Sequence, residues 1–199
     1  TMKSEALFRR FGKFVNSLAG KYITAEDVGI SPSDMVWANM ETDHVVGLPG
    51  KSGDPSPVTA RGTYMGMKAC AKAQFGSDSL AGKKVAVQGV GHVGEYLVEF
   101  LTKEGAEVFI SDIHDSTLKR VSEKYGAKVV GLEEIYDIDM DIYAPCALGA
   151  TVNDDTLSRL NCSIIAGAAN NQLKNENAHG HAVMDKGIIY APDFLINAG

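Results

Sequence analysis

The spacing of apolar residues predicts an alternation of strands and helices over the later, larger part of the chain. Short apolar runs with the composition of buried strands recur from residue 83 on, at 85–88, 107–110, 140–143, 163–166 and 187–190. The stretches between them carry apolar residues at helical spacing, at 92–103, 116–125, 154–160 and 178–185. Apolar strands that alternate with helices are typical of a parallel sheet covered on both faces. We therefore predict an α/β fold with a doubly wound parallel sheet.

The first part of the chain has a different pattern. Residues 4–18 place apolar side chains three and four positions apart, which predicts an amphipathic helix with Ser4 as its N-cap. A short strand is predicted at 21–24 and a further helix at 58–75, while the last apolar run, before Asn197, is strand-like. The segment 47–57 is rich in glycine and proline, which favour loops. We predict a domain boundary there, with residues 1–46 in one domain and 47–199 in the other. The apolar positions of the first predicted helix are Leu7, Phe8, Phe11, Phe14, Val15 and Leu18.

Composition narrows the class of partner. The chain has 19 Lys and Arg against 25 Asp and Glu, a net charge of −6, and the basic residues do not gather in one stretch. A phosphate-covered partner would be repelled, so we expect no nucleic acid and no anionic membrane surface. The three cysteines are far apart, which favours reduced thiols and a cytoplasmic location. No apolar stretch has the length needed to span a bilayer.

A glycine-rich turn follows the first predicted strand of the sheet. The sequence Gly89-Val90-Gly91-His92-Val93-Gly94 lies between that strand and a predicted helix. In dinucleotide-binding folds the first glycine permits the tight turn, the second lets the backbone approach a pyrophosphate, and the third permits close packing of helix on strand. The pyrophosphate then lies at the helix N-terminus, where free N–H groups favour negative charge. We predict a Rossmann-like dinucleotide-binding domain.

Asp112 is the predicted partner of the ribose. It ends the next predicted strand, 112 − 89 = 23 residues after the first glycine, close to the roughly 20 residues expected of the carboxylate that binds the ribose hydroxyls. A carboxylate at this point repels a 2′-phosphate, and neither Arg nor Lys stands beside it. NAD is therefore favoured over NADP.

Two further clusters and one acidic motif are candidates for chemistry. Segments 144–149 and 166–171 each follow a predicted strand, where small residues would let a flat nicotinamide ring lie against the backbone, although each is equally well a tight connection. Cys146 is favoured as a buried structural thiol over a nucleophile. Asp27, in the segment 24–29, could be buried beside a reacting group as a general acid/base, but a turn or capping acid is the simpler interpretation.

Six ordered motifs resemble the amino-acid dehydrogenases of the glutamate/leucine/phenylalanine/valine superfamily, and the leucine branch most closely. The phenylalanine and valine branches share most of the motifs. The resemblance covers essentially the whole chain. The motifs are ITAEDVG (23–29), GDPSPVTA (53–60), VAVQGVGHVG (85–94), APCALGATVND (144–154), IAGAANNQL (165–173) and YAPDFLINAG (190–199).

The resemblance implies an NAD-dependent oxidative deamination of a branched-chain L-amino acid by a homo-oligomer. It implies that Asp27 exchanges protons, that Asn197 hydrogen-bonds the substrate's α-substituents, and that Ala25 lines the side-chain pocket. The remaining implied residues hold the cofactor: Thr59, Ala169 and Asn170 at the nicotinamide and its ribose, with Gly89, Val90, Gly91, His92, Val93, Gly94, Asp112, Cys146 and Ala147.

The resemblance also implies lysines that we do not find here. The family carries a glycine-rich segment with a carboxylate-binding lysine and a catalytic lysine, and neither Lys3, Lys13, Lys21 nor Lys51 has that surrounding. We therefore expect a central portion of a longer protein, inactive alone, with residues 1–46 as the C-terminal part of a substrate domain. A catalytically silent NAD-binding module is the alternative of a different class.

Overall fold

A computed structural model describes residues 3–27, 29–49 and 54–198. The chain divides after Pro55 into two compact units, and each is described here by itself. The division lies within the glycine- and proline-rich segment 47–57, of which residues 50–53 are outside the described residues. Within the described residues, no helix is both long and apolar enough to cross a bilayer.

The larger unit is built on a six-stranded sheet in which every neighbouring pair of strands is parallel. The strand order is β3-β2-β1-β4-β5-β6, the order of a doubly wound dinucleotide-binding fold. The predicted fold class is therefore confirmed. The strands are β1 (Lys84–Gln88), β2 (Glu107–Ser111), β3 (Lys128–Val129), β4 (Ile142–Pro145), β5 (Ile164–Ile165) and β6 (Ile189–Tyr190).

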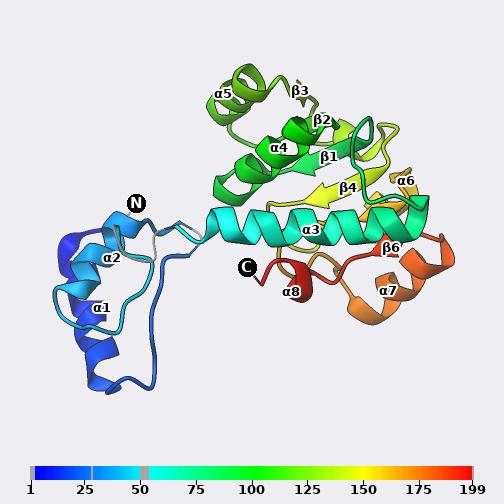
Figure 1. The fold of residues 1–199 in the computed structure, drawn as a ribbon. Helices are drawn as coiled ribbons and strands as arrows, with labels where there is room; N and C mark the ends of the chain where they lie inside the picture. The colour runs from blue at the N-terminus through cyan, green and yellow to red at the C-terminus, as the bar shows by residue number, and fades with distance from the viewer. Residues whose placement is uncertain (1–2, 28, 50–53, 199) are drawn as a thin grey trace. The chain divides into compact units, whose positions relative to one another are not determined.

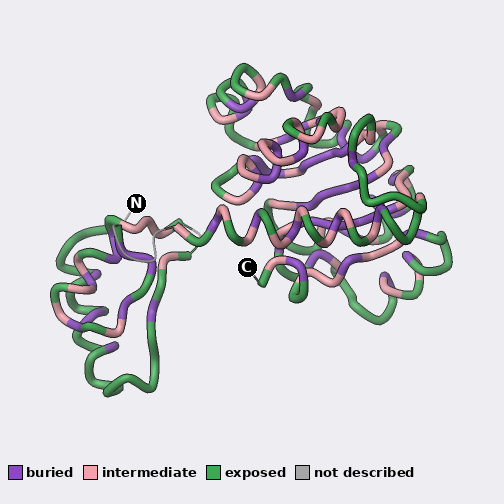
Figure 2. Tube along the Cα trace, viewed as in Figure 1, coloured by how far each residue is buried: buried purple, intermediate pink, exposed green. Residues whose placement is uncertain are grey.

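Helices cover both faces of this sheet (Figure 1). Side chains of α3 (Ser56–Phe75), α4 (His92–Glu104) and α5 (Asp115–Tyr125) share one hydrophobic cluster with the strands. The 3-10 helix η1 (Glu134–Tyr136), α6 (Asp154–Arg159) and α7 (Glu176–Asp185) contribute to a second cluster that contains Ala86, Tyr143 and Ile165. Neighbouring strand residues such as Val85 and Ala86 alternate between the clusters, as strand geometry requires. Figure 2 shows that the buried residues follow the strands.

The direction of α3 places its first turn near the carboxyl ends of the strands. The end of α3 is close to the start of β1, because the Lys83 ammonium lies 3.8 Å from the centre of the Phe75 ring. The helix consequently runs opposite to the parallel strands and begins at their carboxyl ends (Figure 1). Glu104 ties α3 to α4 by accepting hydrogen bonds from Tyr64 and Lys68 and from the backbone N–H of Leu80.

Several predicted elements of this unit differ in detail. β3 was not predicted, because Lys128 and Val129 are both exposed and form no apolar run. The strand-like run before Asn197 is instead the short helix α8 (Asp193–Ile196), which follows Pro192 and has Asp193 in its first turn. The strand predicted at 140–143 is shifted to Ile142–Pro145.

The smaller unit contains α1 (Glu5–Ser17) and α2 (Pro32–Asn39). Ser4 caps α1, as predicted, by accepting a hydrogen bond from the N–H of Leu7. The two helices cross closely at Gly12, where an added Cβ atom would lie 2.4 Å from the carbonyl oxygen of Ala38. The buried cluster of the unit consists of Phe8, Met35, Ala38, Val45 and Leu48.

One prediction for the smaller unit is wrong in part, and the burial of the α1 stripe is uneven. The strand predicted at 21–24 is reduced to one parallel bridge between Thr24 and Val45. Of the predicted apolar stripe, Phe8 and Val15 are buried in this unit. The other four side chains, Leu7, Phe11, Phe14 and Leu18, are exposed.

Candidate active site

The turn from β1 into α4 has the geometry of a phosphate-binding loop. We call residues 89–94 the glycine loop. Gly89 has φ of 95°, a left-handed conformation that side chains disfavour. A Cβ atom added at Gly94 would lie 2.0 Å from the carbonyl oxygen of Gly89, so helix and turn are in backbone contact there. These are the roles predicted for the first and third glycines.

The second glycine leaves space for a ligand. Gly91 is exposed, and no atom outside its own neighbourhood lies within 4 Å of an added Cβ position. Gly91 is also the N-cap of α4, and no side chain caps that helix. The backbone N–H groups of His92 and Val93 belong to this uncapped first turn, where a helix favours an anion. The loop therefore fits a pyrophosphate.

Asp112 is held beside this loop by two backbone groups. Its Oδ2 accepts a hydrogen bond from the N–H of Val90 at 2.9 Å, and its Oδ1 accepts one from the N–H of His114 at 2.9 Å. Each carboxylate oxygen has a second lone pair, so the group can still accept bonds from ribose hydroxyls. The side chain of the following Ile113 is 75% exposed.

The connections after β4 and β5 pack against the glycine loop and against each other. The N–H of Cys146 donates to the carbonyl of Gln88 at 2.7 Å, and an added Cβ at Gly89 would lie 2.7 Å from the Cβ of Ala147. At Gly167 an added Cβ would lie 2.1 Å from the carbonyl oxygen of Pro145. The small residues of both connections thus permit close backbone packing, which is one of the two interpretations that the sequence left open. They also lie at the carboxyl ends of the strands, as the other interpretation requires.

The Cys146 thiol lies at the junction of these loops and is not activated. Burial raises its pKa to about 12, although its Sγ is 3.5 Å from the N–H of Ala168, which favours the thiolate. A thiol with so high a pKa is a weak nucleophile near neutral pH. Its geometry supports the interpretation as a structural thiol. Cys70, Cys146 and Cys162 are all free.

The loop after β5 carries two of the predicted cofactor residues and meets the predicted substrate residue. We call residues 167–172 the amide loop. Asn197 Nδ2 donates to the side-chain Oδ1 of Asn170 at 2.6 Å and to the carbonyl of Ala168 at 3.1 Å. Ala169 is buried, and its N–H donates to the carbonyl of Pro145. The Asn197 amide cannot be reversed, because its oxygen would then face the carbonyl oxygen of Ala168.

This arrangement defines what Asn197 can offer. Both protons of its amide nitrogen are used within the protein, which leaves the side-chain oxygen as the available group. An acceptor in this position suits a donor such as an ammonium group. The position of Asn197 depends on α8, because Ile196 packs on α3 at Gly66, where an added Cβ would lie 2.4 Å from the Ile196 Cγ2.

The three remaining predicted residues, Thr59, Ala25 and Asp27, lie in different units of the chain. Thr59 is half-buried in the first turn of α3, the end of that helix that lies at the carboxyl edge. Ala25 and Asp27 belong to the smaller unit, and both are exposed there, so the burial suggested for Asp27 is not found in that unit. The carbonyl of Asp27 accepts a hydrogen bond from the N–H of Ile30, which makes a turn.

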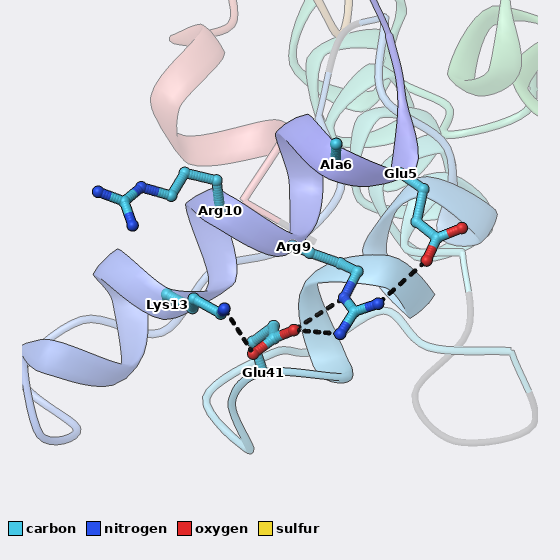
Figure 3. Close-up of a pocket in the computed structure, with 6 residues that line it drawn as sticks. All are labelled: Glu5, Ala6, Arg9, Arg10, Lys13 and Glu41. Carbon is cyan, nitrogen blue, oxygen red and sulfur yellow. Dashed lines mark hydrogen bonds and ion pairs between the residues drawn. The ribbon is translucent and has the colours of Figure 1, made fainter.

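A shallow pocket on α1 contains none of the predicted site residues (Figure 3). Arg9 pairs with Glu41 at 2.7 Å and with Glu5 at 3.3 Å, while Lys13 lies 3.8 Å from Glu41. These ion pairs neutralise most of the charge of the side chains that line the pocket. The Arg10 guanidinium lies over the Phe14 ring, 4.7 Å from the ring centre. Ion pairs on an exposed helix face are typical of surface structure. Its lining is Glu5, Ala6, Arg9, Arg10, Lys13 and Glu41.

Comparison with known proteins settles the family. The model of the Glutamate/Leucine/Phenylalanine/Valine dehydrogenase family matches residues 50–118 and 110–199. The chain belongs to this family. It is 54% identical over 200 residues to leucine dehydrogenase from Bacillus subtilis (strain 168), covering 99% of this chain and 55% of that protein. It is 45% identical over 205 residues to phenylalanine dehydrogenase from Lysinibacillus sphaericus, with 99% and 54% covered.

The fold of this family member also matches a solved relative. The crystal structure of L-tryptophan dehydrogenase from Nostoc punctiforme superimposes with a TM-score of 0.78 at 44% identity, covering 99% of this chain and 57% of that one. The chain spans about half the length of the curated relatives it matches. The family consists of NAD(P)-dependent amino-acid dehydrogenases with a Rossmann-like fold.

Sequence reasoning missed one buried side chain of the candidate site. Gln172 is fully buried, and its Nε2 donates to the carbonyls of Gly167 at 2.7 Å and Ala169 at 2.9 Å. The sequence did show Gln172 as a polar residue near the end of the IAGAANNQL motif. A glutamine after two asparagines is typical of an exposed turn, and only the structure places it inside the loop.

Proposed function

We propose that the full-length protein oxidatively deaminates a branched-chain L-amino acid, with leucine as the preferred substrate and NAD as the oxidant. The amino acid, NAD⁺ and water give the 2-oxo acid, ammonium, NADH and a proton. The strongest support is the 54% identity to leucine dehydrogenase over nearly the whole of this chain. Relatives named for aromatic amino acids are less similar, at 45–47% identity.

The geometry of the carboxyl edge supports NAD as the cofactor. The pyrophosphate would lie against Gly91 and the uncapped N-terminus of α4, and the ribose hydroxyls would bind Asp112. The carboxylate of Asp112 would repel the 2′-phosphate of NADP, because both charges are negative and close. When bound, NAD supplies the acceptor for the hydride from the substrate Cα.

The chain's own residues would bind and orient the substrate. The Asn197 oxygen would accept a hydrogen bond from the α-ammonium group, and Ala25 would leave room for a branched side chain. Asp27 would exchange protons with substrate and water as a general acid/base. Thr59, Ala169 and Asn170 would orient the nicotinamide end of the cofactor, which decides the ring face that meets the substrate.

Assembly and location complete the proposal. We propose that the protein is a homo-oligomer, supported by four exposed apolar residues that recur three and four positions apart along α1, since exposed apolar surface on one side of a helix is a mark of an interface. They are Leu7, Phe11, Phe14 and Leu18. Light scattering on the full-length protein tests this, and a monomer would contradict it. We retain a cytoplasmic location on the basis of the free cysteines.

An assay of NADH formation by the full-length protein tests the activity. We expect turnover with L-leucine to exceed that with L-valine, L-phenylalanine and L-tryptophan, and NAD to be preferred over NADP. The variant Asp27→Asn should lose most of the turnover and keep the NADH affinity, because its residue is placed in proton exchange alone. Higher turnover with L-valine or L-phenylalanine would favour the other branches of the family. NADH binding without any turnover would favour a catalytically silent cofactor-binding module.

A further inference from the structure

Three successive carbonyls of the amide loop accept hydrogen bonds from side chains, whereas the N–H of Ala169 and the carbonyls of Asn171 and Gln172 bond to backbone groups. The carbonyls of Gly167 and Ala169 are both bound by the Nε2 of Gln172, at 2.7 and 2.9 Å. The carbonyl of Ala168, between them, is bound by Asn197. Successive carbonyls thus have different side-chain partners, Gln172 for two of them and Asn197 for the third.

The orientation of Gln172 is fixed by these contacts. Its Nε2 faces two carbonyl oxygens, so exchanging the amide nitrogen and oxygen would set three acceptors against each other. The side chain is fully buried, and its Oε1 has no hydrogen-bond partner among the described residues. Leaving a buried acceptor unpaired lowers stability, which offsets what the two hydrogen bonds donated by Nε2 contribute. Stability alone therefore gives little reason for a glutamine at this position.

The bonds do fix the peptide planes of the loop. In a trans peptide the N–H points opposite to the carbonyl, and no cis peptide bond is present among the described residues. With the Ala169 carbonyl directed at Gln172, the N–H of the same peptide, on the exposed Asn170, points away from Gln172. The backbone of Gln172 is itself held at α8, since its N–H donates to Asp193 Oδ2 at 3.2 Å.

We infer that Gln172 is a positioning residue for the cofactor: its buried amide sets the peptide groups of the amide loop so that the loop receives the nicotinamide end. This inference rests on the proposed function. Gln172 touches neither substrate nor cofactor and acts through Ala169 and Asn170. Losing its two donors lets those peptides rotate, which affects cofactor orientation more than overall folding.

The test uses two variants and one matched control in the full-length protein. Gln172→Met keeps the size of the side chain and removes both donors, and Gln172→Glu keeps its shape. Asn175→Ala removes the side-chain N-cap of α7 and so lowers stability, while the bond that is lost goes to the N–H of Ala178 and not to residues 167–170. For each we measure the NADH dissociation constant by fluorescence titration, the primary isotope effect with α-deuterated L-leucine, and the Tm.

We expect Gln172→Met to weaken NADH binding about tenfold and to enlarge the isotope effect, because hydride transfer becomes slower relative to the other steps. Gln172→Glu should behave likewise at alkaline pH and recover in part as the pH is lowered, since a protonated carboxyl donates one bond. Asn175→Ala should lower only the Tm. If Gln172→Met unfolds, Gln172→Glu tests the positioning role instead: recovery of NADH affinity at lower pH supports that role, and no recovery contradicts it.

The contrary outcomes separate the inference from the proposed function. A Gln172→Met protein with a lower Tm but unchanged NADH affinity and isotope effect would overturn the positioning role alone. Should the wild-type protein bind NADH and turn over no amino acid, the proposed reaction fails while the NADH titration still decides the role of Gln172. A wild-type protein that does not bind NADH overturns both.

Discussion

The glycine loop and the amide loop lie at the same edge of one sheet and are held in different ways. In the glycine loop the closest contact joins backbone to backbone, where Gly94 lies against Gly89. One side chain adds to it, because the Asp112 carboxylate accepts a hydrogen bond from the N–H of Val90. In the amide loop, side-chain amides of Gln172 and Asn197 bind three successive carbonyls. The first loop depends on residues that lack a side chain, and the second on side chains that cannot be shortened. Substitutions should therefore fail for opposite reasons in the two loops.

The largest effect is expected at the closest backbone contact. Gly94→Ala places a methyl group 2.0 Å from the carbonyl oxygen of Gly89, and neither backbone can move aside cheaply. We expect the free energy of unfolding to fall by about 3 kcal/mol or more, measured by urea denaturation. Gly180→Ala in α7 is the matched control, because its methyl group would meet only Leu173 Cδ1, at 3.9 Å. Equal stability of the two variants would contradict the packing role of Gly94.

The second glycine should separate binding from folding. Gly91→Ala adds a methyl group in open space at an extended backbone position, so the free energy of unfolding should change by less than about 0.5 kcal/mol. The same methyl group would occupy the approach of the pyrophosphate, and NADH binding should weaken about tenfold or more. Fluorescence titration measures this. Unchanged affinity would mean that the phosphate does not approach Gly91.

A smaller and local effect is expected where the amide loop joins α8. Asp193→Ala removes the acceptor for the N–H of Gln172 and the N–H of Phe194, which should cost about 1–2 kcal/mol. Hydrogen exchange should accelerate at the Gln172 amide and stay unchanged at the Val90 amide. Faster exchange at both positions would show that the loops are not held independently.

The smallest effect is expected at the junction of the loops. With a pKa of about 12, Cys146 is almost wholly protonated at about pH 8, and its thiolate fraction rises about tenfold for each unit of pH. Iodoacetamide should leave Cys146 unmodified in the folded protein, with full activity, and should label it after denaturation, as seen by mass spectrometry. Rapid labelling of the folded protein would mean that the junction is open.

The two loops also differ in how far they could be predicted. The glycine loop and Asp112 are readable because each role follows from a residue type at a short spacing, and the structure places Gly89, Gly94 and Asp112 as expected. The bond between Asn170 and Asn197 joins residues 27 apart, so the resemblance named both without implying their contact. Gln172 was missed because a buried amide has no sequence pattern of its own.

Outside the site, errors arose where local pattern and tertiary packing disagree. α2 was not predicted although Ser31, Pro32 and Asp34 form a capping box with proline in the first turn, since its residues lack a clear apolar stripe. The amphipathic helix predicted from the apolar stripe is present as α1, but the pattern did not tell which apolar side chains are buried: Phe8 and Val15 are, and Phe14 is exposed.

The order of the strands also determines when the packing around the glycine loop can be completed during folding. β1 lies between β2 and β4, so the glycine loop gains its contact with Ala147 only from a chain segment 147 − 89 = 58 residues later. During synthesis β1, α4 and β2 can assemble first, but the packing under the turn is missing until β4 has crossed over. Non-local parallel pairing of this kind forms slowly. Because a ligand stabilises only the state that binds it, a dinucleotide bound at this turn would favour the completed sheet over partly assembled states.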